Sequence, residues 1–314
     1  MSENLYTDGK PFVVSEILAQ EYHQALADRV GGFYRHPAII NAGTAVGSAV
    51  SKVDFVDTGS MVLASSSENT AVTPTQIATT RASVTLSLHR AARSVSDLLS
   101  ALSENGDIRD PAMFAMDAAQ CYEKTVAKIL IDAAGSFTNS VGGTGTDLTW
   151  ATFRSAGASL YENNTEFVDG SVLAVLHPHQ WADLQNDAAS ASIGDAVARS
   201  PEAQAALGAN GPLSGYRGRY FGIDIYTSAQ VPLSGDGADR LGFMVGKGAL
   251  VWASGDMSGM ANGGNPTFVL DEGRLAVEME RDGSKAMLNV YYNSILGAAI
   301  AQQGAACVVT SGAS

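Results

Sequence analysis

The sequence has little charge, little cysteine and no long apolar run. Only 16% of its 314 residues are charged, well below the roughly one quarter that is usual, whereas the apolar fraction of 46% is ordinary. A chain this apolar and this sparsely charged offsets its conformational entropy by burial, which excludes extensive disorder. Part of its surface must then be uncharged. Such a surface suits a protein that covers itself with further copies of the same chain.

Basic residues are scarce as well. Nineteen Lys and Arg stand against 32 Asp and Glu, so the net charge is −13, and the sequence contains no run of Lys or Arg. Counterion release holds nucleic acid only where cations gather on one face, so a dedicated DNA-binding or RNA-binding protein is disfavoured. The acidic balance keeps the single chain soluble and non-adhesive toward polyanions.

The cysteines form no recognisable site. Cys121 and Cys307 are far apart, in apolar surroundings, with no metal-binding or redox spacing. We interpret both as small hydrophobic residues of a reducing compartment. No signal-peptide pattern is present, and the longest apolar candidate, 295–306, is short and interrupted by Gly and Gln. The chain is therefore expected to be made in a cytoplasm and to span no membrane.

Signatures of catalysis are absent too. The sequence contains no G-x-S-x-G, no H-E-x-x-H, no phosphate-binding loop and no complete G-x-G-x-x-G. Two carboxylate pairs occur, Asp271/Glu272 and Glu278/Glu280. Residues two apart on a strand share a face, so Glu278 and Glu280 fit a solvated sheet or an intersubunit ion-pair row better than acid-base catalysis. We assign no catalytic residue, no cofactor and no metal.

One pair of histidines, His177 and His179, is compatible with metal binding. The pair follows an expected buried strand, 172–176, at the kind of strand end where α/β proteins place sites. A metal needs a third ligand, and Asp183 is the only one nearby. The structural interpretation is favoured: Pro178 opens a helix, one histidine caps it and the other is solvated.

A long connection between two strand-like runs is the first distinctive feature. The runs cover 55–63 and 82–88, and the connection is rich in Ser, Thr and Ala with Pro74 in its middle. A connection of this length is either a disordered surface loop or a functional segment. Its Thr and Val content favours an extended arm that lies on a neighbouring subunit.

The strongest helix signal follows this arm. Asp110 stands at the N-cap position, Pro111 at the first helical position, and Gly135 at the C-terminal stop. At 1.5 Å per residue, such a helix is about 36 Å long. A helix of this length is expected to form a spine across a domain.

A hairpin and a final strand close the chain. Residues 274–281 alternate in polarity, Asp282-Gly283 is a pair typical of a type I′ turn, and 285–292 return. A last strand is expected at 307–309. Because strands and helices mix without strict alternation, the sequence predicts an α+β fold.

This order of segments resembles the major capsid protein of tailed bacteriophages, whose HK97-like fold (the Johnson fold) also forms herpesvirus shells and encapsulins. The resemblance extends over nearly the whole chain and depends on weak signals in a consistent order. The stretches that carry it are 93–99, Asp117 with Ala127, Leu130 and Ala133, 172–184, 222–228 before Val231-Pro232, 244–250, and 278–283 leading to Leu296-Gly297.

The resemblance implies an α+β phage major capsid fold of four parts. These are an N-terminal arm at 1–45; an extended loop at 46–93 with its hairpin at about 53–88; a peripheral domain at 94–137 and 268–294, with the spine helix at 111–134 and the long hairpin at 274–292; and an axial domain at 138–267 and 295–314.

It also implies where copies touch. The expected intersubunit contacts of the extended loop are Thr58, Glu68, Thr73, Pro74 and Arg81. Those of the hairpin tip and spine are Glu278, Glu280, Arg281, Asp282, Gly283, Lys285 and Lys124.

The partners follow from the same resemblance. Copies would form pentamers and hexamers in a closed icosahedral shell of a virion, enclosing double-stranded DNA without binding it specifically. A separate scaffolding protein, a portal protein and decoration proteins would be further partners. Some members of the family cross-link through a lysine of the extended loop, but residues 53–88 contain no Lys, so that chemistry is not expected here.

Three alternatives remain. An encapsulin-like compartment has the same fold but encloses enzyme cargo. A soluble α+β metal-dependent enzyme using His177 and His179 would form a small oligomer. An adhesin or tail-tube module would contain more strands and fewer helices.

Overall fold

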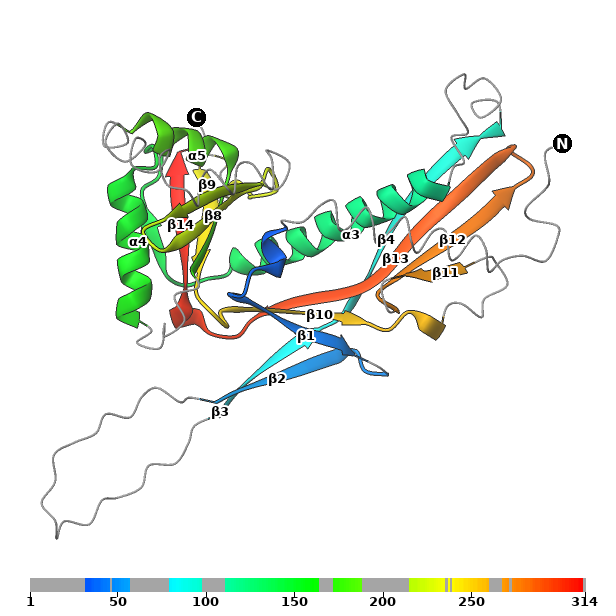
Figure 1. The fold of residues 1–314 in the computed structure, drawn as a ribbon, viewed down its shortest axis with the longest axis horizontal. Coiled ribbons are helices and arrows are strands. Elements are labelled where there is room, and N and C mark those ends of the chain that lie inside the picture. Colours follow the sequence, from blue (N-terminus) through cyan, green and yellow to red (C-terminus); the bar gives the residue numbers. More distant parts are fainter. Residues whose placement is uncertain are drawn as a thin grey trace, which may run out of the picture.

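In the computed structural model, one sheet lies along a long helix and a second sheet lies at the C-terminal end of that helix (Figure 1). The helix is α3 (Pro111–Ala134). A hairpin of β2 (Val50–Val56) and β3 (Thr79–Thr85) packs on the first sheet through Val84 and points away from the second sheet (Figure 1). The predicted α+β class is confirmed. The structure describes residues 32–45, 47–56, 79–97, 111–163, 172–187, 215–234, 237, 239–259, 267–270 and 273–312.

The first sheet is built around one long strand, β13 (Met287–Ile300). One edge of β13 pairs with β12 and then with β10, while the other edge pairs with β4, all antiparallel. β1 adds to β10 in parallel, and β11 adds to β12. The bounds of these strands are β1 (Ile39–Ala45), β4 (Ser87–Ser96), β10 (Leu250–Gly255), β11 (Thr267–Leu270) and β12 (Leu275–Asp282).

Helix α3 covers one face of this sheet, as its apolar stripe predicts. The buried positions recur at helical spacing, from Phe114 through Tyr122 and Val126 to Leu130. They pack against alternate residues of the sheet, such as Val277 and Val290. Alanines at positions 115, 118 and 119 are also buried and let the helix approach the strands closely.

The second sheet lies at the C-terminal end of α3 and has the order β5-β14-β9-β6-β8-β7. Its central strand, β6 (Val172–Leu176), is buried along its whole length, because α4 packs on one face and the hydrophobic core that includes α3 packs on the other. The remaining elements are β5 (Ser140–Gly142), β7 (Tyr216–Tyr220), β8 (Ile223–Thr227), β9 (Asp239–Val245), β14 (Ala306–Gly312), α4 (Trp150–Asn163) and α5 (Pro178–Asn186).

One hydrophobic cluster joins the two sheets. Phe33 and Phe137 both place their rings edge-on to Phe243 of the second sheet, with centroids 6.2 and 6.5 Å away. The same cluster includes Trp252 and Leu296 of the first sheet. The two sheets and α3 therefore share a core. Within the described residues, no helix has the length and apolar character of a membrane span.

The hairpin β2–β3 leaves the body where it crosses β13 at a glycine. A Cβ atom on Gly297 would lie 2.2 Å from the Thr85 carbonyl oxygen and 3.0 Å from Val84 Cγ1. Only a residue without a side chain lets β3 pass this close to β13.

The expected domain boundaries differ from the sheets in three places. Residues 87–93, assigned to the extended loop, belong to β4 and pair with β13 as far as Ser96. β10 and residues 295–300, assigned to the axial domain, belong to the first sheet. Part of the predicted N-terminal arm, Ile39–Ala45, is an integral strand of that sheet. Which sheet a segment joins depends on its pairing with strands that are far away in the sequence, and no local sequence pattern encodes that pairing.

Candidate functional site

The tip of the β12–β13 hairpin is a compact group of charged residues. The predicted type I′ turn at Asp282-Gly283 is wrong, because the turn spans 283–286 and the left-handed residue is Ala286, with φ of 48°. Asp282 Oδ1 accepts hydrogen bonds from the Ser284 amide (3.0 Å), the Ser284 hydroxyl (2.6 Å) and the Lys285 amide (3.3 Å). The Ser284 hydroxyl, the largest influence, holds the pKa of Asp282 below its ordinary value. The side chain of Asp282 therefore closes the turn as a carboxylate.

A second set of contacts ties this tip to the end of β4. Arg281 donates two hydrogen bonds to the Asp97 carboxylate, at 2.6 and 3.4 Å, and the Asp97 amide donates to the Ala286 carbonyl at 2.9 Å. Because the Arg281 side chain is 58% exposed, this ion pair adds little to the stability of the fold and mainly orients the Arg281 side chain. The tip therefore presents oriented charges at the far end of the first sheet.

The other expected contact residues of this region are spread out. Glu278 and Glu280 share the face of β12 that points away from α3, opposite Tyr291 and Asn289 of β13. Lys124 lies in the middle of α3 with an exposed side chain. The structure thus gathers Arg281, Asp282, Gly283 and Lys285 at the tip and leaves Lys124 apart from them.

Of the expected contacts in the extended loop, Arg81 is described. Its guanidinium forms two hydrogen bonds to Asp54 across the β2–β3 ladder, at 2.5 and 2.9 Å. Both side chains are more than half exposed. Thr58, Glu68, Thr73 and Pro74 lie outside the described residues.

The two histidines considered as metal ligands have structural partners. His177 Nδ1 accepts the His179 amide at 3.2 Å, and the His177 amide donates to Gln180 Oε1 at 3.0 Å, so the pair forms a capping box at the start of α5. Burial, with smaller effects from Arg240 and His179, lowers the pKa of His177 to about 4. No group of three His, Cys, Asp or Glu among the described residues is placed to hold a metal. The capping interpretation therefore accounts for the pair.

A polar network that the sequence did not reveal links the two sheets. His36, just before β1, lies with its Nε2 3.1 Å from Asp224 Oδ2 of β8, and the Tyr216 hydroxyl donates to Asp224 Oδ1 at 3.0 Å. Because His36 Nδ1 accepts the Ala38 amide at 3.2 Å, Nε2 carries the ring proton and donates it to Asp224. Burial raises the pKa of Asp224, but the hydrogen bonds from His36 and Tyr216 outweigh it and leave this pKa below its ordinary value.

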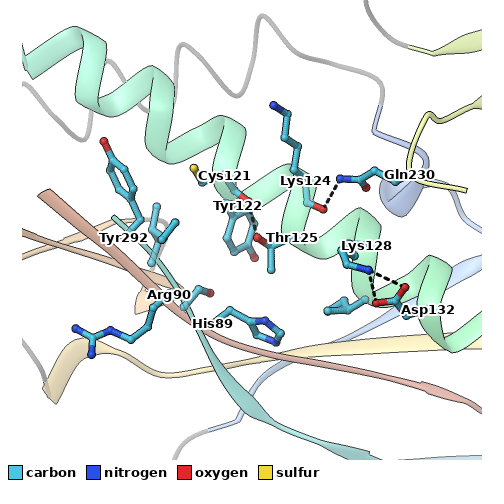
Figure 2. A pocket seen from close by; sticks show the side chains of 14 residues that line it. His89, Arg90, Cys121, Tyr122, Lys124, Thr125, Lys128, Asp132, Gln230 and Tyr292 are labelled. Carbon is cyan, nitrogen blue, oxygen red and sulfur yellow. Dashed lines mark hydrogen bonds and ion pairs between the residues drawn. The ribbon is translucent and has the colours of Figure 1, made fainter. Parts of the chain in front are cut away.

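A groove of about 330 Å³ lies between α3 and the sheet beneath it (Figure 2). The His89 side chain of β4 points into it, facing Thr125 and Lys128 of α3, and Lys128 pairs with Asp132 at 2.8 Å. Burial raises the pKa of the Cys121 thiol in its wall, so this thiol is a poor nucleophile.

The described elements form two α+β bodies on one long helix, with a hairpin at the base of the extended loop. No known sequence family and no curated protein matches it. Solved structures match its fold over most of its length. The capsid of Helicobacter pylori bacteriophage KHP30 has 12% identity and a TM-score of 0.60, covering 90% of this chain and 89% of that one. The capsid of Ralstonia phage GP4 has 12% identity and a TM-score of 0.59, with 90% and 92% covered.

A third similar structure is the encapsulin of the holo-SrpI complex from Synechococcus elongatus, with 13% identity, a TM-score of 0.51, and 85% and 83% covered. At such identities the likeness defines the fold alone. The chain therefore has the HK97-like fold, as its order of segments predicted.

Proposed function

We propose that this protein is the major capsid protein of a tailed double-stranded DNA phage, which assembles as pentamers and hexamers into an icosahedral shell of the virion. Its role is structural rather than enzymatic. The observation that carries the proposal is the β2–β3 hairpin, which packs on β10 of an HK97-like fold through Val84 at its base and extends beyond the sheet at its far end, where Asp54 and Arg81 are exposed (Figure 1). A hairpin of two strands has little stability of its own in water. A neighbouring copy supplies the surface that it lacks.

The charge of the chain supports enclosure of DNA rather than binding to it. A net charge of −13 per copy, repeated over a closed shell, repels the phosphate backbone and keeps the wall from adhering to the packaged genome. The low overall charge fits wide contacts between copies, because interface centres are depleted in charged residues.

We propose the peripheral domain, the axial domain and the extended loop that the resemblance implied, with their boundaries moved to the strands. The first sheet with α3 forms the peripheral domain, the second sheet with α4 and α5 forms the axial domain around the symmetry axes, and β2–β3 forms the base of the extended loop. Arg281, Asp282 and Lys285 at the hairpin tip contact other copies where capsomers meet. A scaffolding protein, a portal protein and decoration proteins are proposed as further partners.

Electron microscopy and light scattering on the purified protein, alone and with a co-expressed scaffolding partner, test the proposal. We expect closed shells, or isolated pentamers and hexamers. A monodisperse dimer or tetramer that never assembles under either condition contradicts it.

The encapsulin match supports a second candidate, a shell that encloses protein cargo. The two candidates differ in content rather than in fold. Shells purified from the native source would contain nuclease-protected DNA if the protein is a phage capsid. A protein cargo released by disassembly, without nucleic acid, would favour the compartment.

A further inference from the structure

A second pocket, of about 330 Å³, lies on the α3 side of the first sheet, where the chain enters β1. The described residues that line it come from the short helix η1 (Phe33–Arg35), β1, α3 and β10, with Arg274 just before β12. Two of these lining residues, Arg35 and Arg274, carry a positive charge, and none of the described ones is acidic. In a chain with a net charge of −13, this pocket is a local concentration of positive charge.

The wall of the pocket contains a buried hydrogen-bond donor that no described residue satisfies. Trp252 of β10 is 3% exposed, and its ring stands edge-on to the ring of Tyr34, with centroids 5.9 Å apart. The indole Nε1 of Trp252 has no hydrogen-bond partner in the described part of the chain, and an indole N–H can only donate. Buried polar groups in proteins are nearly always paired. An unpaired donor in the wall of a pocket therefore indicates that the pocket takes an acceptor.

The carboxylate next to the pocket belongs to Glu123 of α3, and it is held away from the lining. The Tyr34 hydroxyl donates to Glu123 Oε1 at 3.4 Å, and the same oxygen lies 3.9 Å from Arg35 Nη2. Arg35 Nε donates to the Tyr34 hydroxyl at 3.1 Å. Burial, more than any other influence, raises the pKa of Tyr34 to about 12, so the phenol stays neutral and adds no negative charge. The charged groups that line the pocket are therefore cationic.

We propose that this pocket binds a small oxyanion, such as inorganic phosphate or a carboxylate, between Arg35 and Arg274, with the Trp252 indole N–H donating to it. Guanidinium groups match the oxygens of carboxylates and phosphates in a two-pronged geometry, and hydrogen bonds to an ion are stronger than those to a neutral acceptor. A water molecule in the same place would satisfy the indole but would bring no negative charge to the two cations. A bound anion would join η1 and β10 to the start of β12.

Isothermal titration calorimetry on the full-length protein measures the binding directly. Sodium phosphate and sodium acetate are titrated separately at constant ionic strength, with sodium chloride as the blank. We expect one saturable site per chain, with a Kd of about 1 mM or lower for the preferred anion. The comparison of the two titrations identifies a phosphate or a carboxylate as the preferred group. The absence of saturable binding in both titrations would overturn the proposal.

Two substitutions in the pocket and one outside it test the assignment. Trp252→Phe removes the indole donor and keeps an aromatic ring, and Arg274→Gln removes a cation. Each should weaken binding by about tenfold or more, because each removes a hydrogen bond to a charged ligand. The matched control is Arg154→Gln, which removes an exposed arginine from α4 in the other body and should leave the Kd unchanged. Unchanged affinity in both pocket variants, or an equal loss in the control, contradicts the assignment.

Thermal melts separate a loss of binding from a loss of folding. A ligand that binds the folded state alone raises the melting temperature, so phosphate or acetate should raise that of the wild-type protein above its value in chloride. Trp252→Phe should show a much smaller rise, whatever its melting temperature in chloride. A rise equal to that of the wild type would place the anion elsewhere and refute the site. None of these measurements requires a shell, so this inference and the proposed function can fail independently.

Discussion

Asp224 is the side chain whose replacement tests most directly how the two sheets are held together. Its carboxylate accepts one hydrogen bond from His36, beside the first sheet, and one from Tyr216, in the second sheet. The side chains of Asp224 and His36 are 18% and 7% exposed, so water replaces a lost partner poorly. In Asp224→Asn the amide oxygen can keep one of these bonds, while the amide NH2 faces the other donor.

The expected cost follows from these contacts. A hydrogen bond to a charged group contributes about 1.5–3 kcal/mol, and the substitution removes one such bond and the charge that strengthens the other. We therefore expect Asp224→Asn to lower the free energy of unfolding by about 2–3 kcal/mol at pH 7. The matched control is Asp54→Asn, which removes a carboxylate from an ion pair whose partners are 53% and 59% exposed and should cost at most about 1 kcal/mol.

Urea denaturation of the unassembled subunit, followed by circular dichroism, measures both variants. The pKa of Asp224 is lowered in the folded protein, so its stabilisation is complete above the ordinary Asp pKa of about 3.9 and is lost as the pH falls through the folded value. The difference between wild type and Asp224→Asn should shrink below about pH 3.9. A cost no larger than that of Asp54→Asn, or a difference that persists unchanged at low pH, would refute the reasoning.

Three further substitutions probe other parts of the fold. Gln180 is fully buried and makes four hydrogen bonds. Gln180→Leu should therefore lower the free energy of unfolding, measured by urea denaturation, by about 3–5 kcal/mol. A decrease of less than about 1 kcal/mol would show that these bonds contribute little. The pKa of His177 is lowered to about 4, so stability should decline as the pH falls from about 6.5 toward that value; His177→Asn, which retains a cap, should flatten this decline in pH-dependent thermal melts. Gly297→Ala places a Cβ 2.2 Å from the Thr85 carbonyl and should cost about 1–3 kcal/mol. Gly259→Ala, with nothing within 4 Å of the added atom, should leave the melting temperature unchanged, and equal effects of the two alanines would contradict the close approach.

Local signals predicted the local elements well. The helix expected from Asp110-Pro111 to Gly135 is α3, Pro111–Ala134, and the buried strand at 172–176 is β6. The cap at His177 has the expected geometry. Each of these features is encoded within a few residues by apolar spacing, a cap or a proline, so sequence reasoning reached them.

Features that depend on residues far apart in the sequence were not predicted. The placement of β10 beside β13 depends on pairing between Leu250 and Ile300, and the link between His36 and Asp224 joins residues 188 positions apart. The turn at the hairpin tip was also predicted at the wrong residues. The Asp282 side chain accepts hydrogen bonds from the turn amides, and the residue with positive φ is Ala286 rather than Gly283. Nothing in the neighbouring sequence specifies these partners.

The sequence by itself determined the fold class, the main helix and the acidic character, because composition and periodicity act along the chain without reference to distant residues. Only the tertiary structure decided which strands share a sheet, how His36 joins the two bodies, and that β4 pairs with the long strand β13. Those properties arise from contacts between residues far apart in the chain, and such contacts exist only once the backbone has been brought together.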